Sequence, residues 1–345
     1  MTVRTAFIAA AALAGGIGIF HAIADVPTTP VAPGGVAVEV STVPVELRSA
    51  DPTDLRIGKL IYRGGISVVP RSDHFGGLSA LKVSADGSRF VSVEDVGIWV
   101  TGALTYDENG NLAGMNDVRI AQMLDENGAQ LSGKVEGDSE GLAFADPHDL
   151  KGDAFVSYEN HHRVLRFDFA KDGVAAKGQA FAMPDAIKTL RSNEGLEVLA
   201  TLDDGRLLAI SEYGPRDDDQ DSLGWAVDPK TGAATSFIVK RVLPYAMTDA
   251  ALLPDGRVLT LERRFSTLTG PGAELRVFDP ATFMEGATVE GTLIAELFAG
   301  VTVDNMEGVA ARKTADGKTM IYIVSDDNFQ RPLQRTLVMM FELAE

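Results

Sequence analysis

The fold is decided by residues 76–94, G-G-L-S-A-L-K-V-S-A-D-G-S-R-F-V-S-V-E. Apolar and polar residues alternate on both sides of the dipeptide Asp86–Gly87, which is the strongest short signal for a β-hairpin. Related units begin at Ser139, Asn193, Thr248 and Met306. The copies are spaced by about 54 to 62 residues, which is enough chain for four short strands.

A four-stranded unit repeated around a ring is the blade of a β-propeller. We therefore predict an all-β fold, a β-propeller of five blades over residues 55–345. The fifth copy has room for only three strands. We predict that the strand-like run 55–69 completes this blade and closes the ring by pairing with the C-terminal strand. Six blades are the alternative, if residues 36–47 belong to an extra partial sheet.

The amino-acid composition of the chain disfavours some classes of binding partner. The chain has 345 residues, of which 45% are hydrophobic, and its 49 acidic against 31 basic residues give a formal net charge of −18. Such acidity disfavours binding to nucleic acids and to anionic membranes and suits divalent cations. The chain contains no cysteine, so it forms no disulfide bonds.

The N-terminus is typical of a signal peptide. Arg4 precedes an apolar run over residues 6–20, and Ala22-Ile23-Ala24 fits a small-x-small cleavage site. We predict a signal peptide over residues 1–24 and a periplasmic or secreted protein without membrane attachment after cleavage. An uncleaved anchor is the alternative, although the apolar run is short for a membrane span. Residues 25–54 are predicted to be an extended tether or a partial extra strand.

Acidic residues recur where the first strand of each blade begins. The repeat aligns Glu140, Glu194 and Glu307, each followed by glycine, and places Asp249 there in the fourth copy. The first strands of a propeller line its central channel, so these carboxylates would repel one another unless a cation lies between them. Oxygen ligands without cysteine favour calcium, and we predict a calcium site. The alternative is that these acids bond to the backbone of neighbouring blades.

A second set of acids ends the second strand of each copy. Its members are Glu94, Glu159, Glu212, Glu262 and Asp326. We predict that some of them line a site at the rim of the blades. The alternative is that they are solvated loop charges.

One short motif has two interpretations. Residues 137–141, G-D-S-E-G, match the G-x-S-x-G elbow that carries the nucleophile of serine esterases. An elbow requires a helix after the serine, whereas Ser139 is followed by a strand-like run. We therefore predict that Ser139 is incidental and that Glu140-Gly141-Leu142 carries the signal.

Several stretches together resemble a known family. They are Y-R-G-G-I-S-V (62–68), F-G-G-L-S-A-L (75–81), S-E-G-L-A (139–143), N-E-G-L-E (193–197), L-E-R-R-F (261–265) and the tail from residue 325. The chain resembles the bacterial family called "esterase-like activity of phytase". This resemblance implies an exported propeller with a hydrolase or phosphatase-like role, and suggests a phosphate ester as substrate.

The leading functional hypothesis is a calcium-dependent hydrolase of a phosphate or other ester of a small molecule, with metal-bound water as nucleophile. The residues predicted to be catalytic are Glu140, Glu194 and Glu212, and those predicted to bind substrate are Arg263, Arg264, Glu159 and Glu262. The alternative is a non-catalytic propeller that binds a ligand or a protein, since the fold hosts both roles. A lactonase-like activity is a third hypothesis. The oligomeric state is left open.

Overall fold

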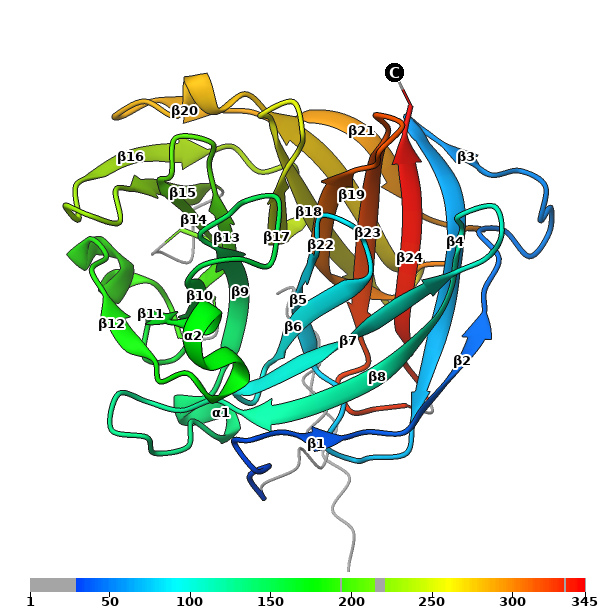
Figure 1. Cartoon of the computed structure of the whole chain (residues 1–345). Helices are drawn as coiled ribbons and strands as arrows, with labels where there is room; N and C mark the ends of the chain where they lie inside the picture. The colour runs from blue at the N-terminus through cyan, green and yellow to red at the C-terminus, as the bar shows by residue number, and fades with distance from the viewer. Residues whose placement is uncertain (1–28, 193, 215–220, 332, 345) are drawn as a thin grey trace, which may run out of the picture.

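The computed structural model describes residues 29–192, 194–214, 221–331 and 333–344. The strands of these residues form five sheets that stand around a common axis (Figure 1). The prediction of an all-β propeller with five blades is confirmed. The predicted signal peptide, residues 1–24, lies outside the described residues.

The blades follow one another along the chain, each with its first strand nearest the axis (Figure 1). From the axis outward, blade one contains β5 (Leu78–Val83), β6 (Arg89–Glu94), β7 (Ile98–Tyr106), β8 (Leu112–Gln122) and β1 (Val36–Ala37). Blade two contains β9 (Ser139–Phe144), β10 (Ala154–Tyr158), β11 (Arg163–Phe167) and β12 (Gln179–Phe181). Blade three contains β13 (Leu196–Thr201), β14 (Leu207–Ser211), β15 (Ser222–Val227), β16 (Ala234–Val239) and β20 (Thr288–Val289).

The last two blades complete the ring. Blade four contains β17 (Ala246–Leu252), β18 (Val258–Ser266), β19 (Gly270–Phe278) and β21 (Thr292–Leu297). Blade five contains β22 (Asn305–Lys313), β23 (Thr319–Asp326), β24 (Thr336–Leu343), β4 (Leu60–Pro70) and β2 (Val40–Pro44), and β3 (Arg56–Ile57) pairs with β4.

The Asp-Gly dipeptides form the expected hairpin turns. Gly87, Gly205, Gly256 and Gly317 all have φ between +79° and +89°. Each donates its N–H to the carbonyl three residues earlier, as Gly205 does to Leu202 at 2.8 Å. Glycine is required at this position because a side chain is strained at positive φ.

The two ends of the domain close the ring together. The N-terminal strand β4 pairs antiparallel with the C-terminal strand β24, with Ile66 opposite Val338. This pairing is the closure that the sequence predicts. Residues 36–44 form no blade of their own, because β1 pairs with β8 and β2 pairs with β4 at the outer edges of blades one and five. The alternative of a sixth blade is therefore wrong.

Apolar side chains fill the space between neighbouring blades. Five buried clusters lie between successive sheets, and the one between blades one and two contains Trp99 in edge-to-face contact with Phe167 at 5.2 Å between ring centroids. The helical segments are short: α1 (Gly133–Glu136), α2 (Phe169–Asp172) and the 3₁₀ turns η1 (Gly173–Ala175), η2 (Asp185–Thr189) and η3 (Pro280–Thr282). Within the described residues, no helix has the length and apolar character needed to cross a membrane.

Candidate functional site

A β-bulge interrupts the first strand of every blade at the same level. The strand register shifts by one residue in β5, β9, β13, β17 and β22. A bulge re-aims the side chain of its extra residue. The residues at this level are Ser79, Glu140, Glu197, Thr248 and Glu307.

This register corrects two of the predicted ligands. Glu140 and Glu307 occupy bulges, as the sequence alignment expects, but the equivalent residue of blade three is Glu197 rather than Glu194. In blade four the equivalent residue is Thr248, which precedes Asp249. In blade three the Glu-Gly-Leu motif does not align with the bulge, because Glu194 lies in the loop before β13.

The second strands supply a second level of side chains. Backbone pairing makes five residues of the second strands equivalent, because each lies opposite the residue two positions before the bulge residue of the first strand. They are Asp95, Glu159, Glu212, Arg263 and Asp326. Glu94 and Glu262 are one residue earlier than this level. Because side chains alternate along a strand, a shift of one residue places them on the other side of the sheet.

The two levels bring seven carboxylates together around the axis, and Asp138, which directly precedes β9, is the eighth. We call these residues the axial cluster: Asp95, Asp138, Glu140, Glu159, Glu197, Glu212, Glu307 and Asp326. All are buried except Glu140, which is partly exposed. Burial, followed by the charges of Glu140, Glu159, Glu212 and Glu307, raises the pKa of Glu197 well above its usual range. The cluster therefore holds protons, or needs cations, at neutral pH.

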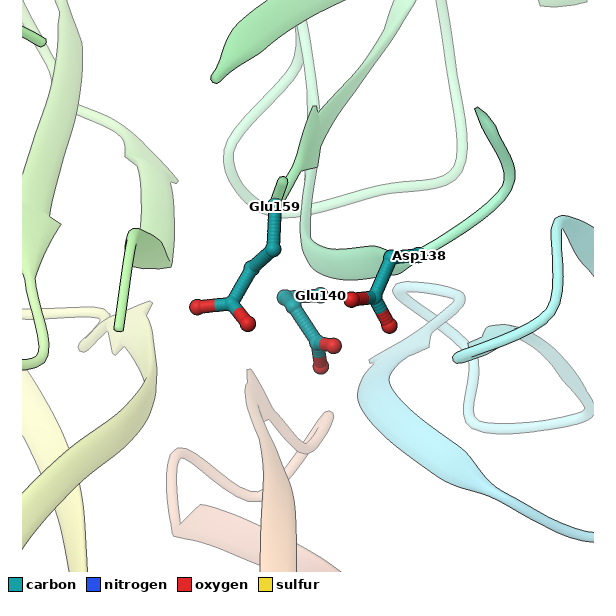
Figure 2. A group of neighbouring side chains, drawn as sticks. All are labelled: Asp138, Glu140 and Glu159. Atoms are coloured by element: carbon teal, nitrogen blue, oxygen red, sulfur yellow. The ribbon is translucent and has the colours of Figure 1, made fainter. Parts of the chain in front are cut away.

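Three members of the cluster have the geometry of a metal site. Asp138, Glu140 and Glu159 each offer a carboxylate oxygen, and these oxygens lie within 4.8 Å of one another. Figure 2 shows Glu140 between the other two, with the three carboxylates converging. An all-oxygen set of carboxylates suits a hard cation such as Ca²⁺. The donor chemistry of these residues therefore fits calcium.

The three carboxylates differ in their other contacts. Asp138 accepts hydrogen bonds from Lys134 Nζ at 2.9 Å and from Asn160 Nδ2 at 2.7 Å. Glu159 accepts a hydrogen bond from the backbone N–H of Gly195. Within the described part of the chain, the Glu140 carboxylate has no hydrogen bond and no ion pair. Burial raises the pKa of Glu140, and the Asp138 charge raises it further.

Two cations border the axial cluster on opposite sides. Lys134 Nζ lies 2.5 Å from Asp95 Oδ2 and 2.9 Å from Asp138 Oδ1. Arg263 Nε lies 2.9 Å from Glu307 Oε1, and Glu212 and Glu197 also stabilise its charge. Arg263 thus borders the cluster at the position where the other four blades each have a carboxylate.

The family described as "Phytase-like: Esterase-like activity of phytase" matches residues 73–329. The chain belongs to this phytase-like family. Among curated proteins, none matches the sequence.

Three solved propellers are similar to this phytase-like chain. The Cps50 (Swd1) β-propeller domain of Myceliophteria thermophila is 9% identical with a TM-score of 0.40, over 88% of this chain and 99% of that one. The Neurospora crassa Pan2 WD40 domain is 8% identical with a TM-score of 0.38, over 80% and 92%. The Dos1 propeller is 11% identical with a TM-score of 0.37, over 89% and 92%.

Of the residues predicted for the site of the phytase-like propeller, Glu194, Glu262 and Arg264 lie outside the axial cluster, as does Asp249. Glu194 forms an ion pair with Arg191. Glu262 accepts a hydrogen bond from Thr260 Oγ1 at 3.1 Å and lies 3.7 Å from Arg276 Nε. Arg264 donates to the Tyr245 hydroxyl at 3.0 Å and its guanidinium stacks on Phe298 at 4.2 Å.

The Asp249 carboxylate of blade four contacts residues of blades one and five. This buried carboxylate accepts hydrogen bonds from Lys82 Nζ at 3.0 Å and from the N–H of Val309 at 2.8 Å. Lys82 also donates to the carbonyls of Ala250 and Val309. The bond from Val309 is the kind of contact with a neighbouring blade's backbone that the alternative expects, and metal binding by Asp249 stays a prediction.

Ser139 does not have the surroundings of a nucleophile. Its buried hydroxyl donates to the carbonyl of Glu94 in blade one at 2.6 Å. The residue joins two blades, as expected for an incidental match to the esterase motif.

The sequence analysis did not identify Asp138, Lys134 or Glu197 as site residues. Glu197 had a signal, because aligning L-E-V-L-A (196–200) with S-E-G-L-A (139–143) places it opposite Glu140. Lys134 and Asp138 had no such signal. Lys134 lies in the connection between blades one and two, and the positions equivalent to Asp138 carry no carboxylate in the other blades: Gly77, Gly195, Ala246 and Asn305.

Proposed function

We propose that this phytase-like propeller is a calcium-dependent hydrolase of a phosphate ester or a related ester of a small molecule. The observation that carries the proposal is the convergence of Asp138, Glu140 and Glu159 (Figure 2). Family membership supports the hydrolase class. The identity of the metal and of the ester is part of the proposal.

The carboxylate set would bind the cation. Asp138, Glu140 and Glu159 supply oxygens from one side of the axis, and Glu140 is the one partly open to solvent. Calcium bound there would neutralise the carboxylates, attract an ester oxygen and lower the pKa of water.

The opposite side of the axis would handle the proton and the charge of the substrate. Hydrolysis adds water to phosphorus or to a carbonyl carbon, and the leaving oxygen takes a proton when its bond breaks. Glu212 suits the role of proton donor, because burial raises its pKa to about 8 despite the nearby Arg263. Arg263 would stabilise negative charge on the substrate if it exchanges its contact with Glu307 for the ester.

Export is part of the same proposal. The signal-peptide pattern of residues 1–24 would direct the chain to the periplasm or outside the cell. Extracellular modules typically bind calcium with dissociation constants up to the millimolar range.

The decisive experiment combines metal analysis with an activity screen. The protein purified without chelator is expected to contain about one calcium per chain. It is also expected to hydrolyse at least one of p-nitrophenyl phosphate, bis-p-nitrophenyl phosphate, p-nitrophenyl acetate and phytate. Chelation should abolish turnover, and calcium should restore it.

A matched pair of variants identifies the site. Glu140→Gln removes one ligand charge and is expected to weaken calcium binding by at least about tenfold. Glu290→Gln carries the same change at an exposed residue paired with Lys240, outside the axial cluster, and is expected to leave calcium binding unchanged. Bound calcium without turnover on any ester would reject the hydrolase and favour a binding propeller. Absence of calcium binding would reject the metal site.

A further inference from the structure

Lys134 holds a position that a divalent cation would compete for. Its ammonium contacts Asp95 and Asp138, and Asp138 is also a member of the proposed calcium site. A calcium ion about 2.4 Å from Asp138 Oδ1 would lie within about 5.3 Å of this ammonium, which is 2.9 Å from the same oxygen. Two cations at this separation, next to a buried cluster, repel each other strongly.

The segment around Lys134 allows its side chain to move while the backbone stays in place. Lys134 belongs to α1, which contains no buried residue, and its side chain is 43% exposed. The backbone of α1 is held by Asn160, whose amide donates to the Lys134 carbonyl at 2.9 Å, and by Arg163, which donates to the Glu136 carbonyl at 2.6 Å. The ammonium can therefore reach solvent without loss of core contacts.

Asn160 connects this segment to the metal site. It has a φ of +57°, which is uncommon for a residue other than glycine. In this conformation its amide donates to both the Lys134 carbonyl and Asp138 Oδ2. Movement of the lysine side chain would leave this link, and hence the position of Asp138, intact.

We propose that Lys134 is an internal counter-ion that offsets the charge of Asp95 and Asp138 when no metal is bound and is displaced when a divalent cation binds. The inference rests on the proposed calcium site and not on the proposed hydrolysis. The Lys134 charge would reduce the repulsion between the buried carboxylates when no metal is bound. The affinity for metal would then depend on Lys134, although this residue is not a ligand.

Calcium titration of four proteins by calorimetry at low ionic strength tests the inference. Lys134→Gln is expected to bind calcium about tenfold more tightly than the parent protein, because a competing charge is removed. Lys134→Arg keeps the charge and should bind like the parent. Lys171→Gln makes the same change in net charge at an exposed residue paired with Asp172 and should stay within about twofold of the parent.

Thermal melting in calcium and in chelator gives a second readout if Lys134→Gln folds poorly without metal. The variant is expected to melt lower than the parent in chelator and to gain more in melting temperature from calcium. Unchanged or weaker calcium affinity in Lys134→Gln overturns the inference, as does absence of calcium binding in all four proteins. Tighter binding without any ester turnover leaves the inference standing and rejects only the hydrolase.

Discussion

Glu262 is a buried carboxylate in the middle of β18, one residue before Arg263. It lies on the side of the strand away from the axial cluster, beside Thr260 and Arg276. Burial raises its pKa from 4.5 to about 7, although the Arg276 charge opposes the shift. A group whose pKa is higher in the folded protein stabilises the fold below its unfolded pKa. This contribution is lost as the pH rises through the folded value.

Glu262→Gln is therefore expected to change how stability depends on pH. Relative to the variant, the parent protein should lose about 3 kcal/mol of unfolding free energy between pH 4.5 and 7.5, at 1.36 kcal/mol per unit of pKa shift. Urea denaturation at several pH values measures this difference. Glu290→Gln, whose side chain is 60% exposed, serves as the control and should run parallel to the parent. Parallel curves for Glu262→Gln would contradict the prediction.

At the scale of the strand and turn, the hairpins depend on single glycines. Gly205 has φ +84°, and a Cβ added to it would meet no atom within 4 Å. An alanine there would suffer backbone strain without any clash. The Asp-Gly pattern thus specifies the turn through conformation rather than through contacts.

Gly205→Ala is expected to lower the free energy of unfolding by about 1 kcal/mol. Gly34→Ala is the matched control, because its added Cβ also meets nothing within 4 Å and its φ is not positive. The control should change stability by less than about 0.5 kcal/mol. Equal effects in the two variants, measured by chemical denaturation, would mean that the left-handed backbone is not the cause.

The bulges are the other decisive element. In each first strand, one extra residue turns a side chain toward the axis, and this brings Glu140, Glu197 and Glu307 together. Without the bulge, strict alternation would continue through the strand. A local irregularity repeated in every blade therefore forms the centre of the site.

At the scale of the whole molecule, the ring is held by one terminal pairing. β24 joins β23 to β4, and β4 in turn pairs with β2 and β3. Removal of β24 would separate the N-terminal strands from blade five and expose two sheet edges.

A chain that ends after Arg335 is expected to lose cooperative unfolding in circular-dichroism melts. A chain that ends after Leu343 keeps β24 and should melt within about 2 °C of the parent, since among the described residues it loses one backbone hydrogen bond, from the Ala344 N–H to the Lys59 carbonyl. Cooperative melting of the shorter chain near the parent temperature would show that the terminal pairing is not needed.

The sequence by itself determined the architecture. Asp-Gly turns between alternating runs, five related units and a missing strand in the last unit predict hairpins, blades and the way the ring closes. These features can be predicted from the sequence because they depend on local conformation and on the hydrophobic pattern along each strand. The acidic ends of the strands also predict a carboxylate site near the axis.

Only the tertiary structure decided which carboxylates meet. The bulges select Glu197 instead of Glu194, and a shift of one residue selects Asp95 and Arg263 instead of Glu94 and Glu262. Lys82 of blade one forms a hydrogen bond with the Asp249 carboxylate of blade four. Register at a bulge and contacts across blades depend on pairing between distant residues, and a one-residue slip reverses the direction of a side chain.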